Sequence, residues 1–248
     1  MNRFQGKTAI ITGGTTGIGL ATARLLVSEG GKVGVTGRTK ASIQAAQQEL
    51  GKGNYAWHSD SGKLADIEQL AKEAKDAFGH IDLLFVNAGV GKFLPLEAVT
   101  EANWDETFSI NLKGAFFAVQ KLSPLIQPGG SVVLTTTIAN DKGMAGSSFY
   151  AASKAGLRSL ARTLSTELLP KGIRVNAVSP GPIDTPIMDK MGLTPEQKAG
   201  FVAHMTNSNP MKRFGTSDEV ARAVLFLATD ATYSTGLELN VDGGAGQL

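Results

Sequence analysis

Short β-rich apolar runs alternate with longer helical segments along the whole of this 248-residue chain, and this alternation limits the possible folds more than any other feature. Several of the runs are apolar on both faces, which is typical of strands in a parallel sheet that helices cover on both sides. The expected strands are Lys7–Thr12, Lys32–Thr36, Tyr55–His58, Ile81–Val86, Ser131–Thr137, Ile173–Val178 and Leu237–Val241. Helical periodicity fills the gaps, for example over Ile18–Ser28 and Leu64–Phe78. The pattern predicts one α/β domain, residues 1–248, with a doubly wound, Rossmann-like parallel sheet of about seven strands and helices on both faces.

Composition excludes several classes of protein. The chain has no cysteine, which rules out disulfides and thiolate metal sites, and its three histidines (His58, His80 and His204) lie far apart without metal-ligand spacing. No run approaches the ~18 apolar residues of a membrane span, and no secretory signal opens the chain. A formal net charge of +2 without a dense basic run argues against nucleic-acid or membrane binding. We expect a cytoplasmic protein with no metal.

The first expected strand leads into a glycine-rich turn, Thr12-Gly13-Gly14-Thr15-Thr16-Gly17-Ile18-Gly19, and then into a helix. Glycine permits positive φ and lets a phosphate approach the backbone, and a helix N-terminus offers unpaired N–H groups to an anion. The spacing differs from the commonest fingerprint, Gly-x-Gly-x-x-Gly, and an ordinary tight turn is the alternative. The position between strand and helix favours a dinucleotide site. Its expected contacts are Gly13, Thr15, Thr16, Gly17, Ile18 and Gly19.

The end of the second expected strand bears on the choice of cofactor. An NAD site usually places an acidic residue about 20 residues after the glycines, to bind the adenosine ribose. Here Arg38 lies 19 residues after Gly19, and the surrounding segment, residues 36–40, contains no acid. A guanidinium can pair with a 2′-phosphate through two hydrogen bonds, although a solvated loop arginine is the alternative. We therefore predict NADP(H) as the cofactor, with NAD(H) the weaker choice.

Tyr150 and Lys154 are four residues apart at the start of an expected helix, so they share one face. A nearby ammonium favours the phenolate and lowers the phenol pKa, which suits a general acid or base. Such spacing is common by chance, and a surface tyrosine beside a solvated lysine is the alternative. Small polar groups or glycine turns also follow four strands, at Thr12, Asn87, Thr137 and Pro180–Thr185. Ligands of open α/β sheets bind at the carboxyl ends of strands, which favours a shared site.

Six motifs in one order make the chain resemble the short-chain dehydrogenase/reductase family, in its compact classical subtype, over essentially the whole length. The motifs are the glycine turn, Asp60 after the third strand, Asn87-Ala88-Gly89, Asn111, Tyr150-x-x-x-Lys154 and Pro180-Gly181-Pro182-Ile183-x-Thr185. The resemblance implies a catalytic set of Asn111, Thr137, Tyr150 and Lys154. It also implies cofactor contacts from Asp60, Ser61, Asn87, Ala88, Gly89, Tyr150, Lys154, Pro180, Gly181, Ile183 and Thr185.

Two positions depart from the family pattern. Val86 stands where the family's turn usually has a first asparagine, and Thr137 stands where the catalytic serine is usual. Threonine keeps the hydroxyl that would bind a substrate carbonyl, while its methyl group narrows the space.

Asn111 lies in the middle of an expected helix, Asn103–Gln120, with Gly114 nearby, and both are poor helix formers. A local distortion there would free a backbone carbonyl for a water that links Lys154 to solvent. A tolerated surface asparagine is the alternative.

The activity implied is hydride transfer between the nicotinamide and a ketone or secondary alcohol, with Tyr150 as general acid or base. We expect Pro182–Pro210 to form a lid, and Met188, Met191, Phe201, His204 and Met205 suggest a small apolar substrate. Ordinary packing of this segment is an equal alternative. Reduction of a 3-oxoacyl-[acyl-carrier-protein] is the rival activity, for which Lys171 and Arg174 would meet the acidic carrier. An NADP-binding sensor or scaffold without turnover is the non-enzymatic alternative.

The resemblance also implies a homotetramer. Helices Asn103–Gln120 and Tyr150–Leu169 usually pair across one interface in the family, and the segment 236–248 resembles a second. The second helix carries an apolar stripe of Leu157, Leu160, Ala161, Leu164 and Leu168, part of which the monomer core will use.

Overall fold

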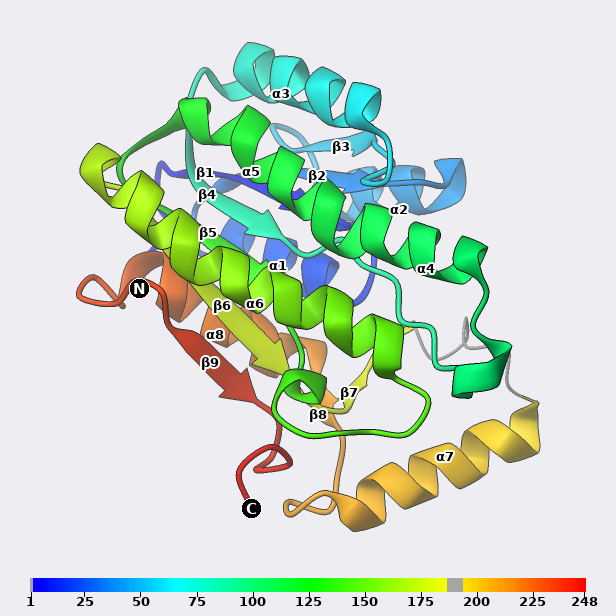
Figure 1. Ribbon diagram of the computed structural model, residues 1–248. Helices are drawn as coiled ribbons and strands as arrows, with labels where there is room; N and C mark the ends of the chain where they lie inside the picture. The colour runs from blue at the N-terminus through cyan, green and yellow to red at the C-terminus, as the bar shows by residue number, and fades with distance from the viewer. Residues whose placement is uncertain (1, 187–193) are drawn as a thin grey trace.

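The structure is a computed structural model that describes residues 2–186 and 194–248. Its main sheet is parallel and has seven strands in the order β3-β2-β1-β4-β5-β6-β9 (Figure 1). The strands are β1 Thr8–Thr12, β2 Lys32–Gly37, β3 Tyr55–His58, β4 Ile81–Val86, β5 Ile126–Thr135, β6 Arg174–Pro180 and β9 Glu238–Val241. A separate pair, β7 Ile183–Asp184 and β8 Gly215–Thr216, lies below the carboxyl edge. The doubly wound parallel sheet predicted from the sequence is confirmed.

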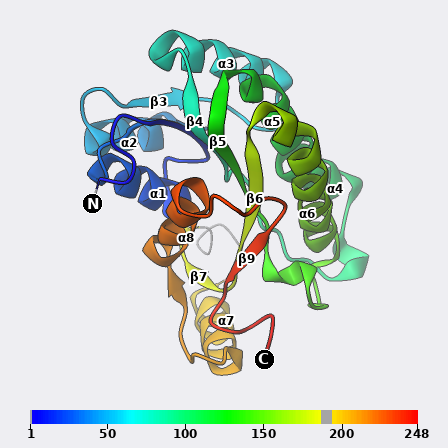
Figure 2. The ribbon, with the colours of Figure 1, turned by 90° about the vertical axis from the view of Figure 1, so that its left-hand side faces the viewer.

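Helices cover both faces of this sheet (Figure 2). The helices are α1 Gly17–Ser28, α2 Lys40–Leu50, α3 Leu64–Phe78, α4 Glu101–Phe108, α5 Ala115–Leu122, α6 Ser148–Leu168, α7 Pro195–Ser208 and α8 Ser217–Thr229, with short 3-10 turns at Leu96–Ala98, Ser123–Leu125, Ile138–Asn140 and Leu169–Lys171. α1, α2 and α8 pack on one face, while α3, α5 and α6 pack on the other. Because both faces are covered, β1 is buried along its whole length and β4 at every residue except Asp82, as their largely apolar sequences require.

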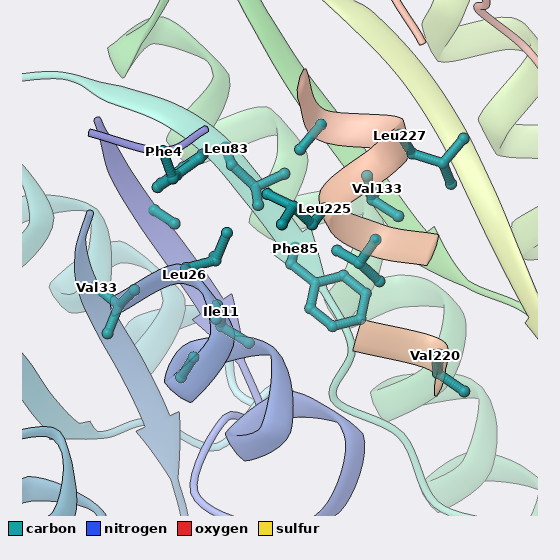
Figure 3. Packing of buried hydrophobic residues seen from close by; sticks show 14 of the residues in the cluster. Phe4, Ile11, Leu26, Val33, Leu83, Phe85, Val133, Val220, Leu225 and Leu227 are labelled. Carbon is teal, nitrogen blue, oxygen red and sulfur yellow. The ribbon is translucent and has the colours of Figure 1, made fainter. Parts of the chain in front are cut away.

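The core on the α1 and α8 side is built from branched aliphatic residues and phenylalanines. Phe85 of β4 lies between Ile11 of β1 and the α8 residues, and Leu26 of α1 lies against the same strands (Figure 3). All of these side chains are essentially inaccessible to solvent. Full burial of one such side chain is worth about 1.5–3 kcal/mol, so this layer holds the first strand and its following turn in place.

The fifth strand ends earlier than the sequence suggested. β5 finishes at Thr135, and Thr137 lies two residues beyond it as the N-cap of the turn Ile138–Asn140. The Thr137 hydroxyl accepts a hydrogen bond from the Ala139 N–H at 3.4 Å. The expected strand Ser131–Thr137 was therefore wrong at its end, because a local cap competes with continuation of the ladder.

The helix expected at Asn103–Gln120 is interrupted, as the asparagine and glycine in it suggested. α4 and α5 are joined by a π-helical segment, Ser109–Gly114, which contains Asn111. A Cβ on Gly114 would lie 1.9 Å from the Ser61 carbonyl oxygen, so this helix can approach the loop after β3 only with glycine there. π-helical insertions are frequent at functional sites.

The apolar stripe of α6 is used inside the protomer. Leu157, Ala161, Leu164 and Leu168 are buried in the core, and Leu160 packs against it. Within residues 2–186 and 194–248, no helix is long and apolar enough to cross a membrane, and no group of three potential metal ligands occurs.

Candidate active site

The ends of β1 and β4 form the base of the site. The Thr12 hydroxyl accepts hydrogen bonds from the N–H groups of Asn87 and Ala88, both at 3.1 Å. The Asn87 amide in turn donates to the carbonyl of Gly13 at 3.1 Å. The turn after β1 and the turn after β4 therefore support each other. The sequence indicated this only by small polar residues at both strand ends.

The glycine turn requires its glycines for two different reasons. Gly13 and Gly17 have positive φ, 63° and 54°, which side chains rarely adopt. Gly19 is needed for close packing instead, because a Cβ there would lie 2.5 Å from the Gly13 carbonyl oxygen. The neighbourhood of Gly17 is more open, with Thr185 and Pro186 at ordinary contact distances. The turn after β6 thus faces the glycine turn.

The N-terminus of α1 suits an anion. Its N-cap, Thr16, makes no side-chain capping hydrogen bond, and the first turn contains no acidic residue. By contrast, α2, α4 and α8 are capped by the threonines Thr39, Thr100 and Thr216. Unpaired N–H groups at a positive dipole end fit a pyrophosphate, so this end of the site fits a dinucleotide.

The end of β2 presents a cation and hydroxyls. Arg38 is exposed, and among the described residues it has no hydrogen bond or ion pair. Beside it, the Ser42 hydroxyl contacts the hydroxyl oxygens of Thr15 at 3.3 Å and Thr39 at 2.8 Å. A Cβ on Gly37 would lie 2.4 Å from the Thr15 hydroxyl, so the strand end and the glycine turn are in direct contact. Arg38 therefore lies close to the turn expected to hold the cofactor.

The acid after β3 is partly engaged in its own loop. Asp60 accepts a hydrogen bond from the Gly62 N–H at 3.0 Å, and its own N–H donates to Asp66 at 2.9 Å. Ser61 is half-buried in the same loop, where its carbonyl meets Gly114. These contacts fix the loop next to the π-helical segment.

Tyr150, Thr137 and Lys154 come together at the carboxyl edge. The hydroxyl of Thr137 lies beside the Tyr150 phenol and acts to lower its pKa. Lys154 is buried, only 4% exposed, and its Nζ donates to the Thr135 carbonyl at 2.6 Å. One side chain of α6 thus contacts the end of β5, and another contacts the turn that follows it.

Asn111 is buried and its amide is fully used. Its Oδ1 accepts from the Val90 N–H at 2.8 Å, and its Nδ2 donates to the Val90 carbonyl at 3.0 Å and to the Ser153 hydroxyl at 3.1 Å. A Cβ built on Gly89 would lie 3.3 Å from both Asn111 Oδ1 and Lys154 Nζ. Asn111 therefore adjoins Lys154, and the alternative of a tolerated surface asparagine is wrong.

Burial dominates the ionisation of the pair on α6. It raises the pKa of Tyr150, and the hydrogen bond from Thr137 opposes that rise. It lowers the pKa of Lys154 to about 8. The expectation that Lys154 lowers the phenol pKa does not hold, because burial of the phenol raises that pKa. The phenol is protonated at neutral pH.

The turn after β6 is held by the last strand. Pro180 is buried and pairs in register with Val241, and the Gly181 N–H donates to the Val241 carbonyl at 3.0 Å. A Cβ on Gly181 would lie 2.7 Å from the Asp242 Cα. Ile183 is buried at the start of β7, and Thr185 faces Gly17. Thr185 therefore borders the glycine turn, while Pro180 and Gly181 lie against the end of β9.

The expected lid is described only in part. Met188 and Met191 lie outside the described residues. Phe201 and Met205 of α7 are half-buried and His204 is exposed, and no residue of α7 is fully buried. None of these three makes a ring contact or side-chain hydrogen bond to the site in the described part of the chain.

Sequence reasoning missed Phe93, an exposed ring that lies 5.3 Å from the Tyr150 ring, centroid to centroid. The Leu94 N–H donates to the Gly146 carbonyl at 2.8 Å and ties this loop to the segment before α6. The signal was present, because Phe93 follows the Asn87-Ala88-Gly89 turn at the carboxyl end of β4. It also missed Ser153 and Thr135, whose contacts depend on the tertiary fold.

Comparison with known proteins agrees with this arrangement. The sequence profile described as Enoyl-(Acyl carrier protein) reductase matches residues 13–246. Oxidoreductase asL5 of Sarocladium schorii is 38% identical over 100% of this chain and 99% of its own length. The 3-oxoacyl-[acyl-carrier-protein] reductase FabG of Thermotoga maritima is 36% identical over 98% of each chain.

Solved structures are equally similar over the full length. The crystal structure of levodione reductase has a TM-score of 0.91 and 34% identity, covering 98% of each chain. The 3-ketoacyl-(acyl-carrier-protein) reductase from Brucella melitensis, complexed with NADH, has a TM-score of 0.90 and 29% identity, covering 98% of this chain and 99% of that one. With a family profile and relatives that span the chain, the protein is an oxidoreductase that belongs to the short-chain dehydrogenase/reductase family.

Proposed function

We propose that the protein is an NADP(H)-dependent oxidoreductase that transfers a hydride between the nicotinamide and a ketone or secondary alcohol, with Tyr150 as general acid or base. The observation that carries this proposal is the meeting of the Thr137 hydroxyl and the Tyr150 phenol at the carboxyl edge, beside buried Lys154 and Asn111. A binding protein without turnover would have no need of a phenol held against a second hydroxyl.

The residues present fit a dinucleotide. The uncapped N-terminus of α1 would hold the pyrophosphate, and Asp60 and Ser61 would border the adenine. The turn Asn87-Ala88-Gly89 and the segment Pro180–Thr185 would enclose the nicotinamide half. When bound, the nicotinamide supplies or accepts the hydride.

Tyr150 is the proton donor for reduction. Its raised pKa keeps the phenol protonated at neutral pH, which is the form that a general acid needs. Thr137 would hold the carbonyl oxygen beside the phenol and orient it. In the reverse direction Tyr150 must lose a proton, and a protonated Lys154 would favour that loss.

Asn111 and Lys154 would serve proton delivery and ribose binding. Lys154 Nζ is already held at the Thr135 carbonyl, and Asn111 adjoins it across Gly89. The π-helical segment Ser109–Gly114 breaks the regular helical ladder, which would leave a backbone carbonyl available to a water. We propose that this water links Lys154 to solvent.

Arg38 supports NADP(H) over NAD(H). It is exposed, lacks an internal partner in the described chain, and stands in the sequence between Gly37, which packs against Thr15, and Thr39, whose hydroxyl contacts Ser42. Guanidinium and hydroxyl donors are the groups that bind a phosphate monoester. The Brucella melitensis relative is complexed with NADH, so the choice rests on this chain's own residues.

An apolar ketone or alcohol is the proposed substrate class. Phe93 extends an aromatic surface from the Tyr150 ring, which suits a cyclic or aromatic substrate. Reduction of a 3-oxoacyl-[acyl-carrier-protein] is the second candidate, favoured by the names of relatives such as FabG of Thermotoga maritima.

The basic residues expected to meet an acidic carrier weaken that second candidate. The Arg174 guanidinium is half-buried and donates to the carbonyls of Leu227, Ala231 and Ala228. Lys171 and Arg174 both lie at the amino end of β6, opposite the edge that carries Tyr150.

We further propose a cytoplasmic homotetramer that acts as one domain with residues 182–210 as its lid. Trp104 is 45% exposed and stacks on Phe108 at 4.4 Å on α4, which leaves an aromatic surface available to a second copy. Light scattering of the purified protein tests the tetramer.

The decisive experiment compares wild type with Tyr150→Phe on a panel of ketones, followed by loss of NADPH absorbance. We expect wild-type turnover and a loss of roughly a thousandfold or more in the variant, since only the transferable proton is removed. NADPH affinity, measured by fluorescence titration, should be nearly unchanged. Tight NADPH binding without turnover of any ketone or alcohol would favour the sensor alternative.

A further inference from the structure

A nearly buried ion pair lies behind the proposed catalytic residues and joins α6 to β9. Arg158 Nε is 2.9 Å from Glu238 Oε2, and the two side chains are only 15% and 12% exposed. The Arg158 Nη1 group donates to the Gly236 carbonyl at 3.0 Å. The contact of Nε with the carboxylate is one of charge rather than an aligned hydrogen bond. The guanidinium is therefore anchored at two points of the last strand segment.

The other oxygen of the carboxylate reaches the end of β5. Glu238 Oε1 accepts a hydrogen bond from the Thr136 hydroxyl at 2.5 Å. The Thr136 N–H donates to the Val178 carbonyl at 2.9 Å, which fixes its backbone to β6. Thr136 directly precedes Thr137, so Glu238 holds the residue next to the proposed substrate-binding hydroxyl.

These contacts form part of a closed ring. It runs from Arg158 of α6 through Glu238 and Thr136 to Thr137, and returns to α6 at Tyr150. Arg158 follows Tyr150 by eight residues and Lys154 by four, so all three lie along one side of α6. At the far side of the ring, the Thr137 hydroxyl lies beside the Tyr150 phenol. We propose that Arg158 and Glu238 are positioning residues, which hold the turn carrying Thr137 at a fixed distance from the helix carrying Tyr150. This inference rests on the proposed function of Thr137 and Tyr150.

A role in stability alone is a weak explanation for this pair. Removing two charges from water is costly, and a buried ion pair is often no better for stability than apolar side chains of similar size. What such a pair does provide is a defined geometry between the elements that it joins. Lys154 makes the other link between α6 and the end of β5, but the proposed function assigns its ammonium to the cofactor ribose as well. The Arg158–Glu238 link is independent of the cofactor.

The test uses Arg158→Met and Glu238→Gln in the full chain, with kcat, KM and the pH profile of kcat/KM for ketone reduction as readouts. We expect kcat to fall about tenfold in each, because small displacements of reacting groups have effects of this size. The KM for NADPH should change less than about twofold, since no cofactor contact is removed. The basic limb of the pH profile should move to higher pH, because a less firmly held Thr137 opposes the rise of the Tyr150 pKa less. Arg158→Lys, which keeps the charge, should recover part of the kcat.

A double variant covers the case in which a single variant does not fold. Arg158→Met with Glu238→Leu leaves no uncompensated buried charge, so it should fold while keeping the low kcat and the shifted profile. The matched control is Arg24→Met, which removes the exposed pair between Arg24 and Glu49 and should leave all readouts unchanged.

Two results would overturn the proposal. One is a folded Arg158→Met or Glu238→Gln protein with wild-type kcat and pH profile. The other is recovery of full kcat in the double apolar variant, which would make the pair merely structural. If Tyr150→Phe is inactive while these variants are normal, only the positioning role fails. If Tyr150→Phe itself keeps its activity, the proposed function fails.

Discussion

The carboxyl edge of the sheet and helix α7 border the same end of the molecule but are built in opposite ways. At the edge, Lys154, Asn111 and Thr137 are buried, and Lys154 and Asn111 are each hydrogen-bonded to another element. α7 has no fully buried residue, and it lies apart from the main sheet in the ribbon view (Figure 1). Chemistry needs fixed distances between reacting groups, which the carboxyl edge provides. Substrate selection can be made by half-exposed apolar side chains such as those of α7.

After Tyr150→Phe, the largest effect should come from the carboxyl edge, at Thr137. Thr137→Ala removes the hydroxyl that would hold the carbonyl oxygen and that lies beside the Tyr150 phenol, so we expect kcat to fall roughly a hundredfold. Thr137→Ser keeps the hydroxyl and should stay active, with better use of bulkier ketones because the methyl group is gone. Steady-state kinetics with a small and a bulky ketone measure both effects. Wild-type kcat in Thr137→Ala would mean that the edge is not the reacting region.

A second large effect concerns the cost of burying Lys154. Its pKa in the folded protein, about 8, is below the ordinary lysine value of 10.5, so the unfolded chain binds more protons between these pH values. Stability should therefore rise with pH in that window, by up to about 3 kcal/mol, as the penalty of the buried charge disappears. Below pH 8 Lys154 is charged in the folded protein, so the buried charge destabilises it by the full amount.

Denaturant unfolding of the cofactor-free wild type and Lys154→Met at pH 7, 8, 9 and 10 measures this rise. The Tyr150 contribution, which has the opposite sign above pH 10, is common to both proteins and cancels in first approximation. A stability difference that stays constant from pH 7 to 10 would show that Lys154 is not desolvated in the folded protein.

A substitution at Arg38 tests an exposed side chain outside α7. Its kinetic effect can be as large as that of a buried residue at the carboxyl edge, or as small as that of a residue on α7. In Arg38→Asp, we expect the KM for NADPH to rise about tenfold or more while kcat with saturating cofactor changes little, since a bidentate phosphate contact is lost. The KM for NADH should fall in the same variant. A preference of the wild type for NADH would contradict the assignment.

The smallest effects should come from α7. Phe201→Ala removes a half-buried ring from a helix without a buried residue, so the free energy of unfolding should change by less than about 0.5 kcal/mol. The KM for an aromatic ketone should rise a few-fold if the ring contacts substrate during turnover. Thermal unfolding measures the change in stability of this variant, and substrate kinetics measure the change in KM. Thr206→Ala is the control on the same helix. A large loss of stability would show that α7 is part of the core.

Much of the fold and part of the candidate site were predictable, because local patterns encode them. The strands β3 and β4 and the helix α3 occur at the predicted residues, since their periodicity is not opposed by neighbouring signals. The end of β5 was not predictable, because the Thr137 cap competes with the ladder there. The helix interruption at Asn111 was expected from poor helix formers, but its close approach to Ser61 was not.

What the sequence alone determined is what depends on residues close together in the chain. Alternating apolar runs specify strands and helices, glycines specify the first turn, and a spacing of four puts Tyr150 and Lys154 on one helix face. Tertiary structure decided the contacts between distant residues, such as Thr136 with Glu238, which are 102 positions apart. It also decided the low pKa of Lys154, because burial depends on every element that packs around a group, and no local pattern records it.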